Sequence, residues 1–511
     1  MELFTIGFPT ALSLDNLAYC FLGVFLGTFI GVLPGVGSLA AVALLLPVTF
    51  YLDPTTALVM LAGVYYGAEY GGSTASILLN LPGTPSSAVT CLDGHPMTKQ
   101  GRAGVALFVT TSASFVGGSF GILLLIFFAP TIVSFALAFG PAEYFAAMLF
   151  GLIGAATIAQ GTPLKGLAMV AAGVLIGTVG TEAQTGVQRY TFGFLQLYEG
   201  VGLVVLAMGL FGVSEIIASI QGQKASRMEH RISLRSMIPT REDVRRSTLP
   251  ALRGTGVGSA LGALPGAGPS IAAFLSYALE KRVAKDPTRF GKGAIEGIAS
   301  PEAANNAAVQ TAFIPTLSLG IPGSATMAIM LGALMIHGIT PGPQLMVEHP
   351  ELFWGLIASF WIGNLLLLVL NIPLIGLWVG LLTIPYRFLY PGIVVLICVG
   401  VYSLRTSVFD IWMVLGFGLL GYGMRLLRFE PAPLLIGFIL GPMIEDNFRR
   451  AMLLARGDPL RLFERPIAGT LLVMVIGLLA WMIFSAIRAR FRRVSAVAHP
   501  AAGPGSDTVG R

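Results

Sequence analysis

The chain alternates apolar stretches with short polar segments, and the apolar stretches are of two kinds. The first kind is unbroken and rich in Leu, Val, Ile and Phe, which is typical of helices that cross a hydrocarbon core of about 30 Å with roughly 20 residues each. This pattern predicts helices near residues 104–129, 131–158, 164–180 and 200–220, and again near 352–382, 386–403, 408–426, 431–446 and 467–488. The second kind is interrupted by Pro-Gly pairs, and it predicts hairpins at about 17–50 and 254–280 and broken segments at about 55–92 and 296–338. With each hairpin and each broken helix counted once, about eleven or twelve membrane segments are expected.

The interruptions occur twice, at corresponding places in the chain. Residues 27–37, with Pro34-Gly35 inside them, return 231 residues later as 258–268, with Pro265-Gly266. Each copy is followed by a second break, at Pro82-Gly83 and at Pro322-Gly323. Such breaks leave backbone groups unpaired, which lipid does not tolerate unless the break faces protein or a water-filled cavity. Paired breaks in two halves are typical of secondary transporters that bind their substrate between the repeats.

Composition agrees with a membrane protein. Hydrophobic residues make up 55% of the chain and charged residues 11%, whereas about 25% charged residues would be usual for a soluble domain. The 64 glycines and 31 prolines fit a close-packed bundle with broken helices. The predicted fold is an all-α polytopic membrane protein. Three widely separated cysteines suggest neither a disulfide framework nor a metal cluster, and we expect no cofactor and no structural or catalytic metal.

The basic residues are concentrated in a few short segments between apolar stretches. The positive-inside rule places the strongest of them, 224–253, and the tail at 488–493 in the cytoplasm. The first 98 residues contain no Lys or Arg, so no cleaved signal peptide is expected. Basic residues flank the second predicted hairpin on both sides, whereas Glu2, Asp15 and Asp53 flank the first. The second hairpin is therefore expected to enter from the cytoplasm and the first from outside, which makes the two halves inverted repeats. A simple span kinked at proline is the alternative for each hairpin.

These observations divide the chain into four parts. We predict a first transmembrane half at 1–221, a basic cytoplasmic linker at 222–253, a second transmembrane half at 254–490 and a cytoplasmic tail at 491–511. The end of the tail is rich in Ala, Gly and Pro and is expected to be disordered.

Polar residues beside the four breaks are the candidate site, because polar groups inside a membrane are costly unless they are paired or functional. Hydroxyls, amides and exposed helix N-termini suit an anionic carboxylate. The predicted substrate-binding residues are Gly35, Ser38, Asn80, Pro82, Gly83, Thr84, Ser86, Ser87, Gly266, Ser270, Gly323, Ser324 and Thr326. Carboxylate, amide and hydroxyl oxygens suit a hard cation, and the predicted coupling residues are Ser73, Thr74, Glu302, Asn305 and Asn306. Alternatively, these side chains only join helices to one another.

Two glutamates, Glu69 and Glu302, lie just before the polar stretches of their halves. Either carboxylate could neutralise a coupling cation, carry a proton or pair with a nearby basic residue, and either could instead lie at a membrane boundary. An enzyme is not expected. The five histidines have no metal-ligand spacing, and the chain contains neither a Walker A motif nor a complete dinucleotide fingerprint.

Three long motifs carry a resemblance to a known family. They are the run from Asn80-Leu-Pro-Gly-Thr-Pro-Ser-Ser to Lys99-Gln-Gly-Arg102, the run Ser300-Pro-Glu-Ala-Ala-Asn-Asn306, and the run from Gly320-Ile-Pro-Gly-Ser-Ala-Thr to Thr340-Pro-Gly-Pro-Gln344. Together they resemble the large membrane subunit of the tripartite tricarboxylate transporters, along essentially the whole chain to about residue 490. His95 stands where the family pattern has an aromatic residue such as Tyr.

This resemblance implies a permease of the bacterial inner membrane. It implies two partners, a small four-helix membrane subunit and a periplasmic solute-binding protein, and uptake of citrate or another carboxylate by symport with Na⁺ or H⁺. It also implies an elevator-like movement of the hairpins and broken helices past a fixed scaffold. The alternative function is that of a stand-alone secondary carrier for organic anions or amino acids, without partner subunits.

Overall fold

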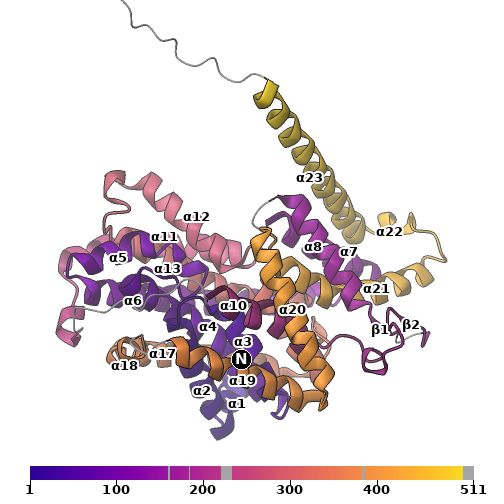
Figure 1. Cartoon of the computed structure of the whole chain (residues 1–511), viewed down its shortest axis with the longest axis horizontal. Coiled ribbons are helices and arrows are strands. Elements are labelled where there is room, and N and C mark those ends of the chain that lie inside the picture. Colours follow the sequence, from indigo (N-terminus) through magenta and orange to yellow (C-terminus); the bar gives the residue numbers. More distant parts are fainter. Residues whose placement is uncertain (159–161, 183–184, 220–232, 383–385, 499–511) are drawn as a thin grey trace, which may run out of the picture.

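The protein is almost entirely helical (Figure 1). The computed structural model describes residues 1–158, 162–182, 185–219, 233–382 and 386–498. Two short strands, β1 (Gly180–Thr181) and β2 (Gln188–Arg189), pair antiparallel in the segment between α8 and α9. The predicted all-α polytopic class is therefore confirmed for the described residues.

The first half begins with short helical turns and then forms a hairpin, a long buried helix and a series of further helical segments. Its elements are η1 (Leu3–Gly7), α1 (Phe8–Ala11), α2 (Leu14–Val32), α3 (Gly37–Thr49), α4 (Pro54–Leu79), η2 (Ser86–Ala88), α5 (Cys91–Lys99), α6 (Ala103–Ala136), α7 (Pro141–Ile158), α8 (Pro163–Gly177), η3 (Leu195–Leu197), α9 (Leu203–Ala207), η4 (Met208–Val213) and α10 (Ser214–Ser219).

The second half repeats the order of hairpin, broken helix and long helix. Its elements are η5 (Leu234–Met237), α11 (Arg241–Gly262), α12 (Gly268–Val283), η6 (Pro287–Arg289), α13 (Glu296–Thr311), α14 (Phe313–Leu319), α15 (Ala325–Ile336), α16 (Gln344–Glu348), α17 (Pro350–Asn371), α18 (Ile375–Leu381), α19 (Tyr386–Arg405), α20 (Val408–Leu426), α21 (Ala432–Leu454), α22 (Arg461–Glu464) and α23 (Pro466–Ala498).

Each hairpin packs closely on the helix that follows it, α2 on α4 and α11 on α13. Glycines four residues apart form the contact in both halves, because this spacing places them on one face of a helix and lets two backbones approach. A Cβ atom at any of them would strike a backbone carbonyl of the facing helix. These glycines are Gly23, Gly27 and Gly31 on α2 and Gly254, Gly258 and Gly262 on α11.

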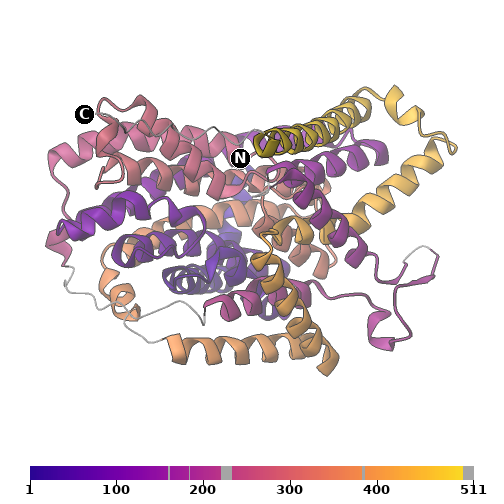
Figure 2. The same ribbon diagram turned by 45° about the horizontal axis from the view of Figure 1, so that its top comes forward.

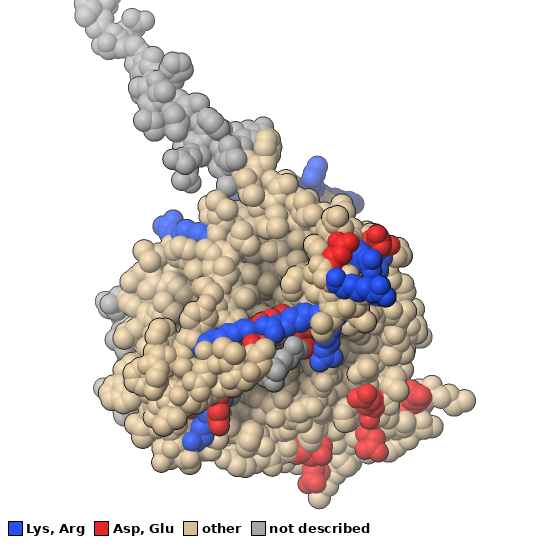
Figure 3. Space-filling view, turned by 90° about the vertical axis from the view of Figure 1, so that its right-hand side faces the viewer, with Lys and Arg blue, Asp and Glu red and all other residues tan. Residues whose placement is uncertain are grey.

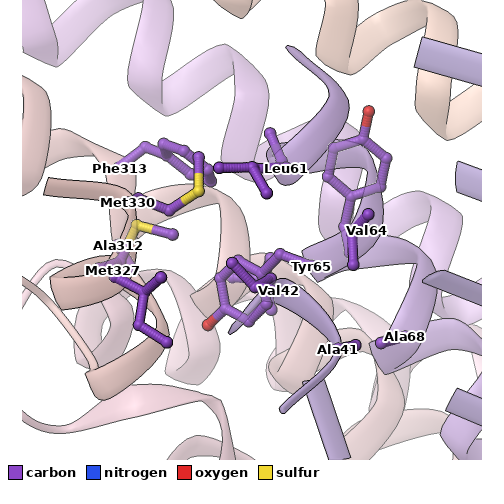
Figure 4. Close-up of a cluster of buried hydrophobic side chains, with 14 of the residues drawn as sticks. Ala41, Val42, Leu61, Val64, Tyr65, Ala68, Ala312, Phe313, Met327 and Met330 are labelled. Atoms are coloured by element: carbon purple, nitrogen blue, oxygen red, sulfur yellow. The ribbon is translucent and has the colours of Figure 1, made fainter. Parts of the chain in front are cut away.

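The long helix that follows each broken segment packs against a helix of the other half. Helix α6 packs on α13, and α17 packs on α4. The two halves also share a buried apolar cluster. In Figure 4, Leu61 and Tyr65 of α4 lie beside Phe313 and Met330 of α14 and α15. The hairpins and broken helices therefore form one interlocked body rather than two separate domains.

A second group of helices lies beside this body, on the right in Figure 1. Helix α21 packs on α7 and α8, α23 runs along the outside of the same pair, and α20 packs on η4 (Figures 1 and 2). Among the described residues, five helices are long and apolar enough to cross a membrane: α2, α6, α17, α20 and the 466–485 part of α23. Charged side chains gather in a few groups on the otherwise uncharged face in Figure 3.

Several helices differ from the sequence-based boundaries. The helix expected at 131–158 begins at Pro141 (α7), and the helices expected at 431–446 and 467–488 end later, at Leu454 (α21) and Ala498 (α23). Helix α6 continues through Pro130 to Ala136, and the Thr131 hydroxyl bonds the Phe127 carbonyl at 3.1 Å beside the interruption. Helix α11 starts at Arg241 instead of near 254, because Thr240 and Asp243 form a reciprocal capping box. The apolar stretch at 352–382 is two helices, separated before Ile375. Two parts of the predicted domains lie outside the described residues. They are the end of the tail, 499–511, and the beginning of the linker, 222–232.

Candidate functional site

The tip of each hairpin is bonded to the second break of its own half. Gly35 and Gly266 adopt φ values of 88° and 82°, which glycine reaches without steric cost. The Gly35 N–H donates to the Pro82 carbonyl at 3.3 Å, and the Gly266 N–H donates to the Gly323 carbonyl at 3.0 Å. The sequence-predicted breaks are thus brought together in pairs, one pair in each half.

Hydroxyl groups from the first pair of breaks surround Glu69, in the middle of α4. This glutamate is 1% exposed. The Ser38 hydroxyl donates to Glu69 Oε1 at 2.6 Å, and the Ser86 hydroxyl donates to Oε2. The hydroxyls of Thr84 and Ser86 are bonded to each other at 2.8 Å. Three predicted substrate-binding residues therefore converge, and the group on which they converge is a carboxylate of the protein itself.

A second polar cluster is centred on Glu302 of α13, which is also 1% exposed. The Thr90 hydroxyl, from the first half, donates to Glu302 Oε1 at 2.5 Å. The Asn306 amide donates to the Glu302 carbonyl at 3.1 Å. Several buried oxygens here accept no hydrogen bond: Glu302 Oε2, Asn305 Oδ1, Asn306 Oδ1 and Gln310 Oε1.

The two clusters meet between the halves. Asn305 lies near the Glu69 carboxylate, but neither its amide nitrogen nor its oxygen forms a hydrogen bond of normal length and angle. Glu69 and Glu302 are close enough for a direct electrostatic interaction. The Tyr65 hydroxyl lies 3.4 Å from the Ser324 hydroxyl, and Thr326 lies beside the same tyrosine. Buried polar groups from both halves thus form one continuous cluster, called the seam below. It comprises Ser38, Tyr65, Glu69, Thr84, Ser86, Thr90, Glu302, Asn305, Asn306, Ser324 and Thr326.

Other predicted site residues have local roles in the first half. The Ser87 hydroxyl donates to the Thr84 carbonyl at 2.9 Å and stabilises the turn. The Ser73 hydroxyl donates to the Tyr70 carbonyl at 2.9 Å within α4, and Thr74 is buried in the same helix. Asn80, at φ 59°, ends α4 and is exposed, as is Pro82.

The remaining predicted residues pack at the turns. A Cβ atom on Gly83 would come within 2.1 Å of the Gly31 carbonyl oxygen of α2 and 2.6 Å of the Gly72 Cα, and one on Gly323 would meet Ala312 at 3.0 Å. Gly83 therefore permits close backbone contact with both the hairpin and its own broken helix, and Gly323 with its own broken helix. Ser324 also caps α15 by accepting the Met327 N–H at 3.3 Å. Ser270 is half-buried in α12.

The sequence-based site list omitted several polar residues of the seam or beside it. Tyr70 donates to Asn364 Oδ1 of α17 at 2.6 Å, and the Asn364 amide donates to the Ser119 hydroxyl of α6 at 3.0 Å. Asn364 could have been found as one of two amides, with Asn371, within the long apolar stretch at 352–382. Glu69 could have been included because it is the sole acidic residue between Asp53 and Asp93.

The fold and this seam can now be compared with known proteins. Residues 17–436 match the model of the tripartite tricarboxylate transporter TctA family. The chain belongs to this family. As a TctA-family protein it is a multi-pass membrane protein of a transporter family, the large subunit of a tripartite system, which confirms the resemblance seen in the motifs.

Two relatives of this TctA-family chain come from Agrobacterium vitis. An uncharacterized 52.8 kDa protein in the TAR-I ttuC' 3' region is 49% identical over 490 residues, which are 96% of this chain and 97% of the relative. An uncharacterized protein in the TAR-II ttuC' 3' region is 52% identical over 233 residues, 46% of this chain and 96% of the relative. No solved structure matches the chain.

Proposed function

We propose that this TctA-family protein is the permease subunit that carries a tricarboxylate or a related carboxylate across the bacterial inner membrane by symport with Na⁺ or H⁺. Its partners would be a small four-helix membrane subunit and a periplasmic solute-binding protein. The observation that supports this proposal best is the seam itself, because buried hydroxyls, amides and carboxylates from both halves meet beside four helix breaks. Secondary transporters bind substrate and coupling ion in this arrangement.

We further propose that the two halves are inverted repeats. The open end of the α11/α12 hairpin carries Arg246, Arg253 and Lys281, whereas Asp15 and Asp53 lie at the open end of the α2/α3 hairpin. The positive-inside rule would put these two ends on opposite sides of the membrane. The interlocked body of hairpins, broken helices, α6 and α17 would then be the moving unit of an elevator, and the helices around α21 its scaffold.

The transport proposal is tested by reconstituted uptake. The chain, its small membrane partner and the binding protein would be assembled in proteoliposomes and offered labelled citrate, malate and tartrate, with and without an inward Na⁺ gradient or pH gradient. We expect uptake of at least one carboxylate that requires both an ion gradient and the binding protein. Uptake of the same carboxylate without the binding protein would instead support a stand-alone carrier.

The inverted orientation is tested by labelling single cysteines in a variant without Cys20, Cys91 and Cys398. A cysteine at Asp53 should react with a membrane-impermeant reagent from outside the cell, and a cysteine at Arg241 should react only from the cytoplasm. Labelling of both positions from one side would rule out the inverted arrangement.

A further inference from the structure

Glu69 and Glu302 differ from two other deeply buried carboxylates of this protein, Glu280 and Asp93. Glu280, 2% exposed, pairs with Arg253 through two hydrogen bonds of 2.9 and 2.5 Å. Asp93, fully buried, accepts three backbone N–H groups at 2.8–2.9 Å and the Tyr277 hydroxyl at 2.9 Å. Within the described part of the chain, neither Glu69 nor Glu302 takes part in an ion pair. Each is held by one or two hydroxyl groups.

Among the residues that the structure describes, the titratable groups that interact electrostatically with the two carboxylates add no positive charge. They are the carboxylates themselves, Tyr65 near Glu69, and Tyr70 and Cys91 near Glu302. An ionised carboxylate in such surroundings is strongly disfavoured unless a counter-ion or a proton accompanies it. Two such groups, close enough to interact with each other, increase this requirement.

The unpartnered atoms around Glu302 show which kind of ligand is missing. Four of them are oxygens that can accept a hydrogen bond or coordinate a cation, namely Glu302 Oε2, Asn305 Oδ1, Asn306 Oδ1 and Gln310 Oε1, and one, Asn305 Nδ2, is a donor. The residues that carry them are at most 2% exposed. This excess of acceptors fits a hard cation or a proton, and it does not fit an anion.

The anionic substrate would meet the same two charges. The Ser86 hydroxyl donates to Glu69, and Thr84 is bonded to Ser86, so the groups best placed to hold a substrate carboxylate already serve a carboxylate of the protein. A second anion beside Glu69 and Glu302 would be repelled as long as these two are ionised and alone. Neutralisation of the pair removes this repulsion.

We propose that Glu69 and Glu302, one from each half and within electrostatic range of each other, form a shared site for the coupling cation, and that the substrate carboxylate binds only after this site is neutralised. This inference rests on the proposed function. It adds Glu69 as a cation-site residue, and it gives the order of binding as ion first and substrate second. Na⁺ and H⁺ share the required chemistry, a single positive charge that carboxylate oxygens can hold.

The ion site is tested without any substrate, on the purified full chain. Unfolding temperatures would be measured at pH 8.5 in NaCl, at pH 8.5 in choline chloride of equal ionic strength, and at pH 5.5 in choline chloride. For the wild type we expect a higher unfolding temperature with Na⁺ or at low pH than in choline at pH 8.5, because either ion neutralises the buried pair. A gain with NaCl at pH 8.5 identifies Na⁺ as the ligand, and a gain at low pH alone identifies H⁺.

The variants Glu69→Gln and Glu302→Gln keep the side-chain size and remove the charge. Each should reduce the ion-dependent gain, and the double variant should lose it while being more stable than the wild type in choline at pH 8.5. Glu143→Gln is the matched control, because Glu143 is buried but paired with Arg465 at 3.1 Å; its gain should equal that of the wild type. An ion-dependent gain that persists in the double variant, or its absence in the wild type, would overturn the ion site.

The order of binding is tested by calorimetric titration of citrate, malate and tartrate at several concentrations of the identified ion. For the wild type, we expect the apparent affinity to rise up to tenfold for each tenfold rise in the ion and for each ion bound. The double variant should bind with an affinity that no longer depends on the ion. An unchanged ion dependence in the double variant would refute the ion-first order. Failure of all three carboxylates to bind at saturating ion would contradict the proposed substrate class and leave the result of the unfolding test standing.

Discussion

The ion pair between Arg253 and Glu280 offers a direct test of what holds the second hairpin together. It joins α11 to α12 by Arg253 Nε to Glu280 Oε2 at 2.9 Å and Arg253 Nη2 to Oε1 at 2.5 Å. The glutamate side chain is 2% exposed and the arginine side chain 34%. The substitution Arg253→Met keeps most of the aliphatic length and removes all donors, so the Glu280 carboxylate stays buried without a partner.

The expected cost follows from that burial. Removing one partner of a fully buried pair destabilises a protein by about 3–5 kcal/mol. Because a third of the arginine is exposed and water can reach the vacated space, we expect about 2–3 kcal/mol for Arg253→Met. The double variant Arg253→Met/Glu280→Gln should recover a large part of this loss, because the unpartnered charge is gone.

Unfolding in detergent, followed by tryptophan fluorescence, would measure these differences. Lys281→Met is the matched control, because Lys281 lies beside Glu280 in sequence, is exposed and forms no ion pair among the described residues. Its effect should be within about 0.5 kcal/mol of zero. The reasoning fails if Arg253→Met is no more harmful than Lys281→Met, or if the double variant is as unstable as Arg253→Met alone.

Three further predictions concern helix packing, the coupling residues and a loop. Gly258→Leu should prevent close packing of α11 on α13 and abolish the folded protein. Gly256 faces open space two residues earlier, so Gly256→Leu should leave the unfolding temperature nearly unchanged. Equal effects of the two variants on the unfolding temperature would exclude the glycine contact as the cause of the Gly258→Leu effect. Asn305→Ala should raise the Na⁺ or H⁺ concentration for half-maximal uptake several-fold, whereas Thr84→Ala should act chiefly on substrate affinity. Uptake measured at a series of ion concentrations and at saturating substrate distinguishes the two effects. An unaltered ion dependence in Asn305→Ala would remove this amide from the site. The Thr185 hydroxyl, with Arg189 and Arg449, holds the pKa of Glu182 below its ordinary value of 4.5. The attachment of the β1–β2 segment to α21 should therefore be complete above that pH and weaken as the pH falls below it. Limited proteolysis of this segment at a series of pH values should show the change, and Glu182→Gln should abolish it.

The local features of the chain could be predicted from the sequence. Gly35 and Gly266 stand at the hairpin tips, and Asn80 and Gly320, at φ 59° and 69°, end the helices before the second breaks. These positions are predictable because proline and glycine act on the backbone of their own segment. Helix ends that depend on side-chain caps are harder to predict from the sequence. The start of α11 at Arg241 depends on the reciprocal hydrogen bonds of Thr240 and Asp243. It lies in a basic, polar segment, where the hydrophobic pattern does not indicate a helix.

The partners of the polar side chains could not be predicted. Ser38, Thr84 and Ser86 were expected to hold a substrate carboxylate, and in the structure they surround Glu69. Thr90 reaches Glu302 across 212 residues of chain, and Tyr65 reaches Ser324 across 259. Hydrogen bonds at such separations depend on how helices are packed, and no spacing along the chain encodes them.

By itself, the sequence determined that this is a helical membrane protein of repeated halves with broken helices, because hydrophobic length, Pro-Gly interruptions and small-residue spacing are properties of one segment at a time. The tertiary structure alone decided that the two halves interlock through α6 and α17, and that Glu69 and Glu302 lie within electrostatic range of each other without a basic partner among the described residues. The physical reason is that burial and electrostatic pairing are set by all the surrounding helices together. A carboxylate has the same identity in the sequence whether it lies in water, beside an arginine, or alone in the interior.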